Sequence, residues 1–122
     1  MSTHISRIGT VIVPVGDQDR ALEFYVGMLG FEKRIDGEYG DGARWIEVAP
    51  PGAETTIALV SANQGDPLEV SLATENADAD HADLREHGVD ADAEVMRMGD
   101  YVPPMFTFRD PDGNRFRVVE RD

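Results

Sequence analysis

Cysteine is missing from the sequence altogether, which excludes disulfide frameworks, thiolate zinc sites, iron–sulfur clusters and cysteine nucleophiles. Basic residues are scarce: 11 Lys and Arg stand against 24 Asp and Glu, and the formal net charge is -13. Nucleic acids and anionic membranes are polyanions that proteins meet with clustered Lys and Arg, so the charge argues against both as partners. The expected partner is a small molecule, and a cationic or polar one fits the acidic charge best.

Long apolar runs are absent too, since none approaches the ~18 residues that a helix needs to cross a bilayer. Residues 1–7 have neither the basic start nor the apolar stretch of a signal peptide, so a soluble cytoplasmic protein is expected. The 122 residues, 41% of them hydrophobic, suit one domain rather than two large ones.

The first half of the chain predicts one strand, one helix and three further strands. Asp17 is a typical N-cap, apolar residues recur at spacings of three and four from Ala21 to Leu29, and Gly30 ends the helix. The strands are expected at residues 8–15, 31–35, 44–48 and 55–60, with turns at 36–42 and 50–54.

The same pattern returns after a polar linker at residues 62–67. Asn76 caps a helix that reaches His87 and stops at Gly88. Strands are expected at residues 68–74, 89–96, 105–109 and 115–119. The sequence therefore predicts an α+β fold of tandem βαβββ modules, at about residues 5–61 and 67–121, within one domain that spans residues 1–122.

Four segments carry a resemblance to a known family. They are Val15-Gly16-Asp17, Ala21-Leu22-Glu23-Phe24-Tyr25, Leu29-Gly30-Phe31, and Phe108-Arg109-Asp110-Pro111-Asp112-Gly113-Asn114. Together they resemble the vicinal oxygen chelate superfamily, which includes glyoxalase I, bleomycin-resistance proteins, extradiol dioxygenases and fosfomycin-resistance enzymes. The resemblance implies that each module curls into a half-barrel, that a curved mixed sheet forms a cup for the ligand, and that a short chain like this one pairs into a homodimer.

The resemblance also implies four metal-ligand positions, on the first and last strands of each module. They fall on Thr10, Ala58, Glu69 and Arg117, of which only Glu69 is a good ligand. No cofactor and no metal site are therefore predicted, although a divalent metal held by an unexpected set such as Glu47, Glu69 and His4 stays open.

Glu69 and Arg117 should face each other, because the family's strand order places the first and last strands of a module side by side. Two interpretations remain open. The pair either meets a polar ligand in place of the missing metal, or it is a cross-strand salt bridge that holds the sheet together.

Side-chain alternation divides each predicted strand into two faces, and the resemblance implies that the helix covers one face and that the other lines the cup. Trp45 is the only tryptophan, and it is either an aromatic wall of the pocket or ordinary sheet packing. The predicted ligand-binding residues are Thr10, Trp45, Glu47, Ala58, Glu69, Ser71, Met105, Thr107 and Arg117. The other face should form the core, with Ile46, Val48, Ile57, Leu59, Val70, Leu72, Phe106, Phe108, Phe116 and Val118.

Two weaker signals concern histidine and methionine. His81 and His87 do not share a helical face and are expected at the surface. Met96, Met98 and Met105, with Tyr101 and the two prolines before Met105, form an apolar stretch that is either a lid, a dimer contact or core.

Two functions fit these residues. The first is a metal-independent binding protein that resembles the bleomycin-resistance branch. The alternative is an enzyme, a glyoxalase-like lyase, an isomerase or a dioxygenase-type member, which needs another metal site or acid–base chemistry. The candidate catalytic residues for that alternative are Glu69, Glu47 and Arg117. Fold alone does not choose between the two, because one scaffold hosts many functions.

Overall fold

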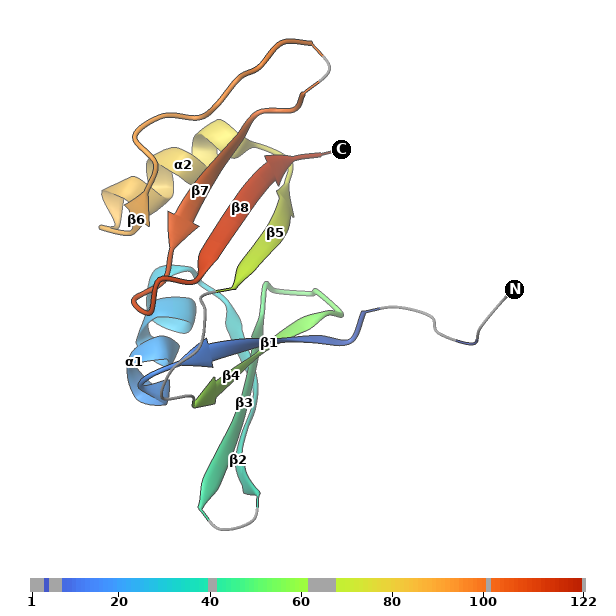
Figure 1. The fold of residues 1–122 in the computed structure, drawn as a ribbon, viewed down its shortest axis with the longest axis vertical. Coiled ribbons are helices and arrows are strands. Elements are labelled where there is room, and N and C mark those ends of the chain that lie inside the picture. Colours follow the sequence, from blue (N-terminus) through green and yellow to red (C-terminus); the bar gives the residue numbers. More distant parts are fainter. Residues whose placement is uncertain (1–3, 5–7, 40–41, 62–67, 101, 122) are drawn as a thin grey trace. The chain divides into compact units, whose positions relative to one another are not determined.

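The computed structural model describes residues 4, 8–39, 42–61, 68–100 and 102–121, and the statements below concern these residues. The chain divides into two compact units, Met1–Asn63 and Gln64–Asp122. Each unit contains a four-stranded mixed sheet and helical structure on one side of it (Figure 1). The predicted α+β class is therefore confirmed. The predicted linker at residues 62–67 lies outside the described residues.

The first unit follows the predicted strand–helix–three-strand order. Its strands are β1 (Thr10–Val15), β2 (Glu32–Tyr39), β3 (Ala43–Ala49) and β4 (Thr56–Ser61). They lie in the order β1-β4-β3-β2, with β1 parallel to β4 and the remaining pairs antiparallel. The first and last strands of the unit are thus neighbours, which places residues from both ends of the unit on one ladder.

Two helical segments connect β1 to β2. They are α1 (Gln18–Leu22) and the π-helix η1 (Glu23–Met28). Asp17 caps the start as predicted, since its carboxylate accepts the Arg20 N–H at 3.0 Å. The prediction of a single α-helix is wrong for the second half, where the Leu29 N–H donates to the Phe24 carbonyl at 3.0 Å, a wider turn than the α-helix makes. Gly30, at φ +78°, ends the helix as expected.

The predicted turn at residues 36–42 is wrong in its first part, because β2 continues to Tyr39. Asp36 lies directly across from Ile46 in the hairpin, and the Arg44 guanidinium donates to its two carboxylate oxygens at 2.8 and 2.9 Å. This two-point contact between the strands favours extended backbone at Asp36, where composition alone suggests a turn.

The second unit repeats the topology of the first. Its strands are β5 (Glu69–Thr74), β6 (Asp90–Ala91), β7 (Met105–Arg109) and β8 (Arg115–Glu120). They lie in the order β5-β8-β7-β6, again with the first and last strands parallel neighbours. Helix α2 (Ala77–Glu86) begins after Asn76, whose side chain accepts the Ala79 N–H at 3.0 Å as predicted. The tandem βαβββ arrangement is therefore confirmed.

The predicted strand at residues 89–96 is wrong, because β6 covers only Asp90 and Ala91. Asp92 donates its backbone N–H to the Thr107 carbonyl at 2.9 Å, as a further ladder residue would. Its carboxylate, however, accepts the Thr107 N–H at 3.0 Å, in the place of a backbone carbonyl, and the ladder ends there. Beyond it, only an isolated bridge between Met96 and Met105 remains.

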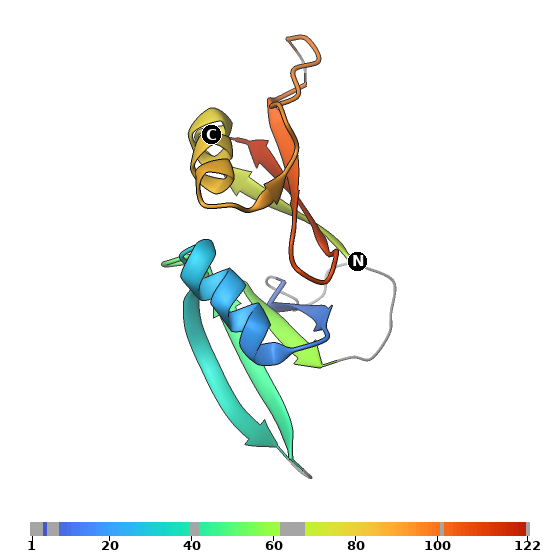
Figure 2. The same ribbon diagram turned by 90° about the vertical axis from the view of Figure 1, so that its left-hand side faces the viewer.

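Each sheet packs one face against its own helix (Figure 2). The His81 ring on α2 contacts the Phe106 ring edge-on, with centroids 5.1 Å apart, and Phe108 stacks on Phe116 at 5.2 Å. The predicted core residues are 5% exposed or less, except Val70 and Leu72, which are half-buried. Among the described residues, no helix is long and apolar enough to cross a membrane.

Candidate functional site

The predicted ligand-binding residues lie on the side of each sheet turned away from its helix, which we call the far face. In the first unit, Thr10 on β1 pairs with Thr56 on β4, and Glu47 on β3 pairs with Ala58 on β4. Trp45 is two residues before Glu47 on the same strand and so shares its face. Thr10, Trp45, Glu47 and Ala58 are therefore neighbours on one surface of the first sheet.

The far face of the second unit has the same register relations. Glu69 on β5 pairs with Arg115 on β8, Ser71 pairs with Arg117, and Thr107 on β7 also pairs with Arg117. Thr10 and Glu69 thus hold corresponding positions in the two units, as do Ala58 and Arg117. Met105, the remaining predicted residue, is half-buried on β7.

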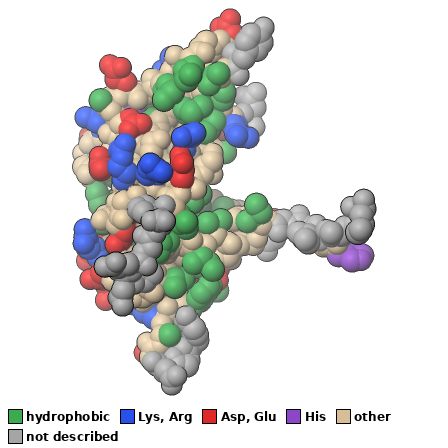
Figure 3. Space-filling view, viewed as in Figure 1, with side chains coloured by type: hydrophobic (Ala, Val, Ile, Leu, Met, Phe, Trp, Pro, Cys, Tyr) green, Lys and Arg blue, Asp and Glu red, His purple; other side chains and the backbone are tan. Residues whose placement is uncertain are grey.

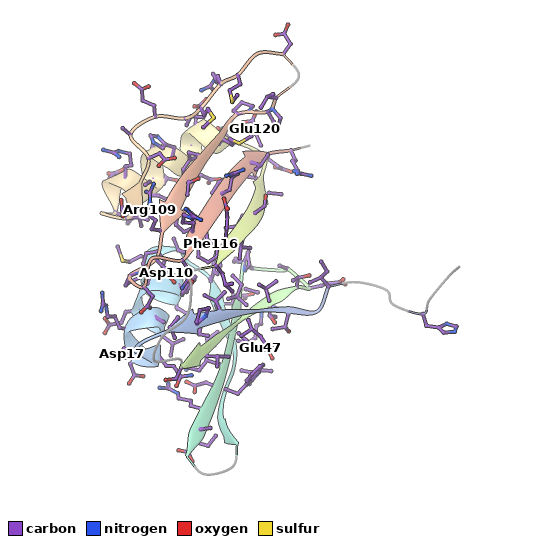
Figure 4. All side chains as sticks on the ribbon, in the orientation of Figure 1. Asp17, Glu47, Arg109, Asp110, Phe116 and Glu120 are labelled. Carbon is purple, nitrogen blue, oxygen red and sulfur yellow. The ribbon has the colours of Figure 1, made fainter. Side chains whose placement is uncertain are left out.

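A chain of hydrogen bonds joins the polar residues of the first far face. The Thr56 hydroxyl donates to Glu47 Oε1 at 2.6 Å, and the Trp45 indole Nε1–H donates to Glu47 Oε2 at 2.7 Å. The Thr56 hydroxyl also lies 2.9 Å from that of Thr10. Because the Thr56 hydroxyl has one proton and donates it to Glu47, the Thr10 hydroxyl is the donor in its hydrogen bond to Thr56. Glu47, marked in Figure 4 on β3, is the centre of this network.

Side-chain alternation places Thr56 on the same face as Ala58, although Thr56 is not among the predicted ligand-binding residues. Thr56 is 8% exposed, and nothing in its sequence context distinguishes it from other threonines of predicted strands. The signal that identifies it is register: it is the direct partner of Thr10, and it lies on the same face as Ala58. Alternation within β4 gives the face of Thr56, but its hydrogen bond to Glu47 depends on how β4 is aligned with the neighbouring strands.

Glu47 is held in its charged form. The hydrogen bonds from Thr56 and then Trp45 lower the pKa of its carboxyl below the ordinary value, and they outweigh the partial burial that acts in the opposite direction. A carboxylate with a lowered pKa is a weak base. Glu47 is therefore better suited to attract a positive charge than to remove a proton.

The second far face carries an ion pair between the two residues that the sequence analysis expected to meet. Arg117 Nη2 lies 2.8 Å from Glu69 Oε1, and Arg115 Nη2 lies 4.0 Å from the other carboxylate oxygen. The three side chains are 42 to 57% exposed. Two guanidinium groups thus share one carboxylate, and basic and acidic side chains gather over β5 and β8 in the space-filling view (Figure 3).

Arg109 extends this row of arginines along the sheet, since it pairs with Arg115 across β7 and β8. It is neutralised by other groups, because Arg109 Nη2 lies 2.6 Å from Asp92 Oδ1 and Arg109 Nη1 lies 3.4 Å from Asp90 Oδ1. Partial burial raises the pKa of Asp92, but the Arg109 hydrogen bond and the Thr107 N–H outweigh it and lower that pKa overall.

The turn before β8 fixes the position of the basic far face. Asp110 and Asn114 are 5% and 1% exposed. Asp110 Oδ1 accepts the Asn114 N–H at 2.8 Å, its Oδ2 accepts the Asn114 side-chain amide at 2.9 Å, and Asn114 Oδ1 accepts the Leu68 N–H at 2.9 Å. The motif that contributed to the family resemblance therefore ties the end of β7 to the start of β5.

The family's metal positions do not suit a metal ion. In the first unit, Thr10 donates its hydroxyl proton to Thr56, and Ala58 has no donor atom. In the second unit, Glu69 is bound to Arg117, a guanidinium that cannot ligate a cation. Throughout the part of the chain that the structure describes, no group of three or more His, Asp or Glu side chains is arranged to hold a metal ion.

The structure corrects the prediction for His81 and removes one of the three interpretations of the methionine stretch. His81 is half-buried rather than exposed, since its ring packs on Phe106 and its Nε2 lies 2.7 Å from the Asp92 carbonyl. His87 is exposed as predicted. Met96 and Met98 are 49% and 62% exposed, so neither is core. Tyr101 lies outside the described residues.

Comparison with known proteins gives a consistent family. The model of the glyoxalase/bleomycin resistance protein/dioxygenase superfamily matches residues 7–118. The curated protein YetH of Bacillus subtilis (strain 168), which bears the description "uncharacterized", is 32% identical over 123 residues, covering 95% of this chain and 99% of its own.

Solved structures also resemble nearly the whole chain. A member of the same superfamily from Sphaerobacter thermophilus is 33% identical with a TM-score of 0.87, and the match covers 98% of this chain and 100% of that one. TnmS3, an antibiotic binding protein from Streptomyces sp. CB03234, is 35% identical with a TM-score of 0.85, and the match covers 99% and 100%.

Proposed function

The chain belongs to the glyoxalase/bleomycin resistance protein/dioxygenase superfamily, and from that premise we propose that it binds a small molecule without a metal ion. The observation that carries the proposal is the donor set at the family's metal positions. One of these positions is an alanine, and another is an arginine already paired with the single carboxylate of the set. The far faces of the two sheets then serve recognition.

The similarity to TnmS3 supports the ligand class. That protein is described as antibiotic binding, so a scaffold and a sequence close to this one serve to bind a small molecule. Indole, threonine hydroxyls, carboxylate and guanidinium groups on the far faces are the mixture of apolar and polar groups that such ligands require.

An acid–base enzyme is the less supported alternative. It needs Glu47, Glu69 or Arg117 to move a proton. The hydrogen bonds to Glu47 lower its pKa, which weakens it as a base. The Glu69 carboxylate is engaged by Arg117. These contacts suit residues that hold a ligand in place.

The proposal includes a homodimer in the cytoplasm, as the family resemblance and the acidic, cysteine-free composition suggest. Sedimentation equilibrium should give twice the 13.4 kDa mass of the chain. A monomer across the accessible concentration range would contradict the dimer and leave ligand binding to be judged separately.

The test of ligand binding is a thermal-shift screen of antibiotics of different charge, carried out in EDTA. A ligand present at 100 times its dissociation constant stabilises the folded chain by about 2.7 kcal/mol, which raises Tm by several degrees for a domain of this size. The substitution Arg117→Ala should reduce the shift, whereas Glu23→Gln, on the helical side of the first sheet, should not. A screen without any shift, or with shifts only after a metal is added, would overturn the proposal.

A further inference from the structure

The far face of the first unit carries a carboxylate whose hydrogen-bond donors are both neutral. Thr56 and Trp45 donate to the two oxygens of Glu47, and neither donor carries a charge. Within residues 8–39, 42–61, 68–100 and 102–121, no Lys or Arg forms a salt bridge with Glu47, whereas Asp36 and Glu69 each pair with an arginine. Glu47 thus presents a negative charge without a countercharge on a half-buried surface.

A half-buried charge without a countercharge is costly for the protein alone. The two donors compensate part of the lost hydration, and a carboxylate has about four lone-pair sites, of which they occupy two. The carboxylate can therefore attract a positively charged group of a ligand. An amine would also donate hydrogen bonds to the remaining lone pairs, whereas a quaternary ammonium group would contact the carboxylate through its methyl groups.

Trp45 adds a second attraction at the same place. Its indole Nε1–H is fixed on Glu47 Oε2, so the orientation of the ring is coupled to the carboxylate. The face of an indole attracts cations that lie within about 6 Å of it, and tryptophan is the best of the aromatic side chains for this purpose. A carboxylate hydrogen-bonded to an indole edge therefore combines two groups that both favour an organic cation.

We propose that Glu47 and Trp45 bind the positively charged amine or quaternary ammonium group of the ligand, with Thr56 and Thr10 as positioning residues that hold the carboxylate. This inference rests on the proposed function and names the chemical class of the group recognised. A metal ion fits this place less well, since one carboxylate and hydroxyls already engaged in hydrogen bonds do not make a coordination sphere.

The two far faces have different charges. The first carries Glu47, whereas on the second Arg115 and Arg117 outnumber Glu69. The recognition of a cation is therefore assigned to the first unit specifically, and substitutions in the two units should separate the recognition of positive groups from that of negative groups.

The experiment compares choline with 3,3-dimethylbutan-1-ol, which has the same shape and no charge. The sequence has one tryptophan, so the indole N–H of Trp45 gives a single side-chain signal in a proton–nitrogen NMR spectrum. Choline should shift this signal in a saturable way, with a dissociation constant at least about tenfold lower than that of the alcohol, from cation–π and charge attraction together. The substitution Glu47→Gln should reduce this preference to about twofold or less.

The substitution Glu47→Gln removes the negative charge but can keep the hydrogen bonds to Trp45 and Thr56. The amide oxygen can accept from Trp45, the amide group can donate to Thr56, and Thr56 can then donate to Thr10. The matched control is Glu23→Gln, which removes the same charge from the exposed Glu23 of η1, on the other side of the same sheet. It should leave the preference for choline unchanged.

Equal affinity for choline and the alcohol in the unmodified chain would overturn the inference, whatever the variants do. A preference for choline that survives Glu47→Gln, or that Glu23→Gln removes equally, would also overturn it. If cationic antibiotics from the thermal-shift screen bind to the Glu47→Gln variant as they do to the unmodified chain, the proposed function stands and this inference is wrong. If neither the probes nor the antibiotics bind, both are wrong.

Discussion

Among single residues, the two far faces differ in what occupies the four positions that the family resemblance marks as metal positions. Thr10 is bound to Thr56 and Ala58 is fully buried beside Glu47, whereas Glu69 and Arg117 form an ion pair. Side-chain alternation is enough to place these residues on one face. It does not reveal that Trp45 and Thr56 both donate to Glu47, because hydrogen-bond partners depend on rotamers and strand register.

Arg117 tests whether its ion pair serves the ligand or the sheet. Both Arg117 and Glu69 are about half exposed, and exposed ion pairs contribute about 0 to 1 kcal/mol to stability. We predict that Arg117→Ala lowers the free energy of unfolding by less than about 1 kcal/mol in urea titrations. A loss of several kcal/mol would assign the pair a mainly structural role.

Asp36 gives a pH-dependent prediction. The hydrogen bond from Arg44 lowers the pKa of Asp36 from 3.8 to about 2. Because the pKa is lower in the folded chain than in the unfolded chain, the pair stabilises the fold above about pH 4, and the contribution disappears as pH falls from about 4 to 2. The stability difference between the unmodified chain and Asp36→Asn should shrink over this interval. A difference that stays constant with pH would contradict this assignment.

At the scale of elements, the sequence predicts most of the fold, and the exceptions have local causes. The N-cap residues Asp17 and Asn76 mark where the helices begin, and Gly30 marks where the first helical segment ends. The strand at β6 is shorter than predicted because the Asp92 side chain replaces a backbone acceptor. Strand β2 is longer because Arg44 binds Asp36 across the hairpin. Both exceptions are side-chain contacts between segments that sequence periodicity treats separately.

The turn from Asp110 to Asn114 is expected to hold β5, β7 and β8 in place. Substitution Asn114→Ala leaves the buried Asp110 carboxylate and the Leu68 N–H without the bonds that Asn114 supplies. We predict a loss of about 2–3 kcal/mol in the free energy of unfolding.

The control in this turn is Asp112→Asn, at an exposed position, which should change stability by about 0.5 kcal/mol or less. If Asn114→Ala had an equally small effect, the turn would not be the anchor of the second far face.

At the scale of the whole molecule, the repeated topology produces two surfaces of different chemistry on one backbone plan. The strand orders β1-β4-β3-β2 and β5-β8-β7-β6 are equivalent, and so are the registers that place Thr10 and Glu69. The net charge of -13 favours cationic ligands by long-range attraction, which salt screens. Increasing ionic strength should therefore weaken the binding of a cationic ligand more than that of a neutral one.

We propose that ligand binding needs no metal ion. The most direct measurement takes a compound that stabilises the chain and titrates it, by calorimetry, into protein stripped with EDTA and into protein supplied with nickel, zinc, manganese or iron(II). The dissociation constant should be the same, within about twofold, in all five conditions, because neither Ala58 nor Arg117 can ligate a metal ion. Binding that appears only in the presence of one of the metals would contradict the account.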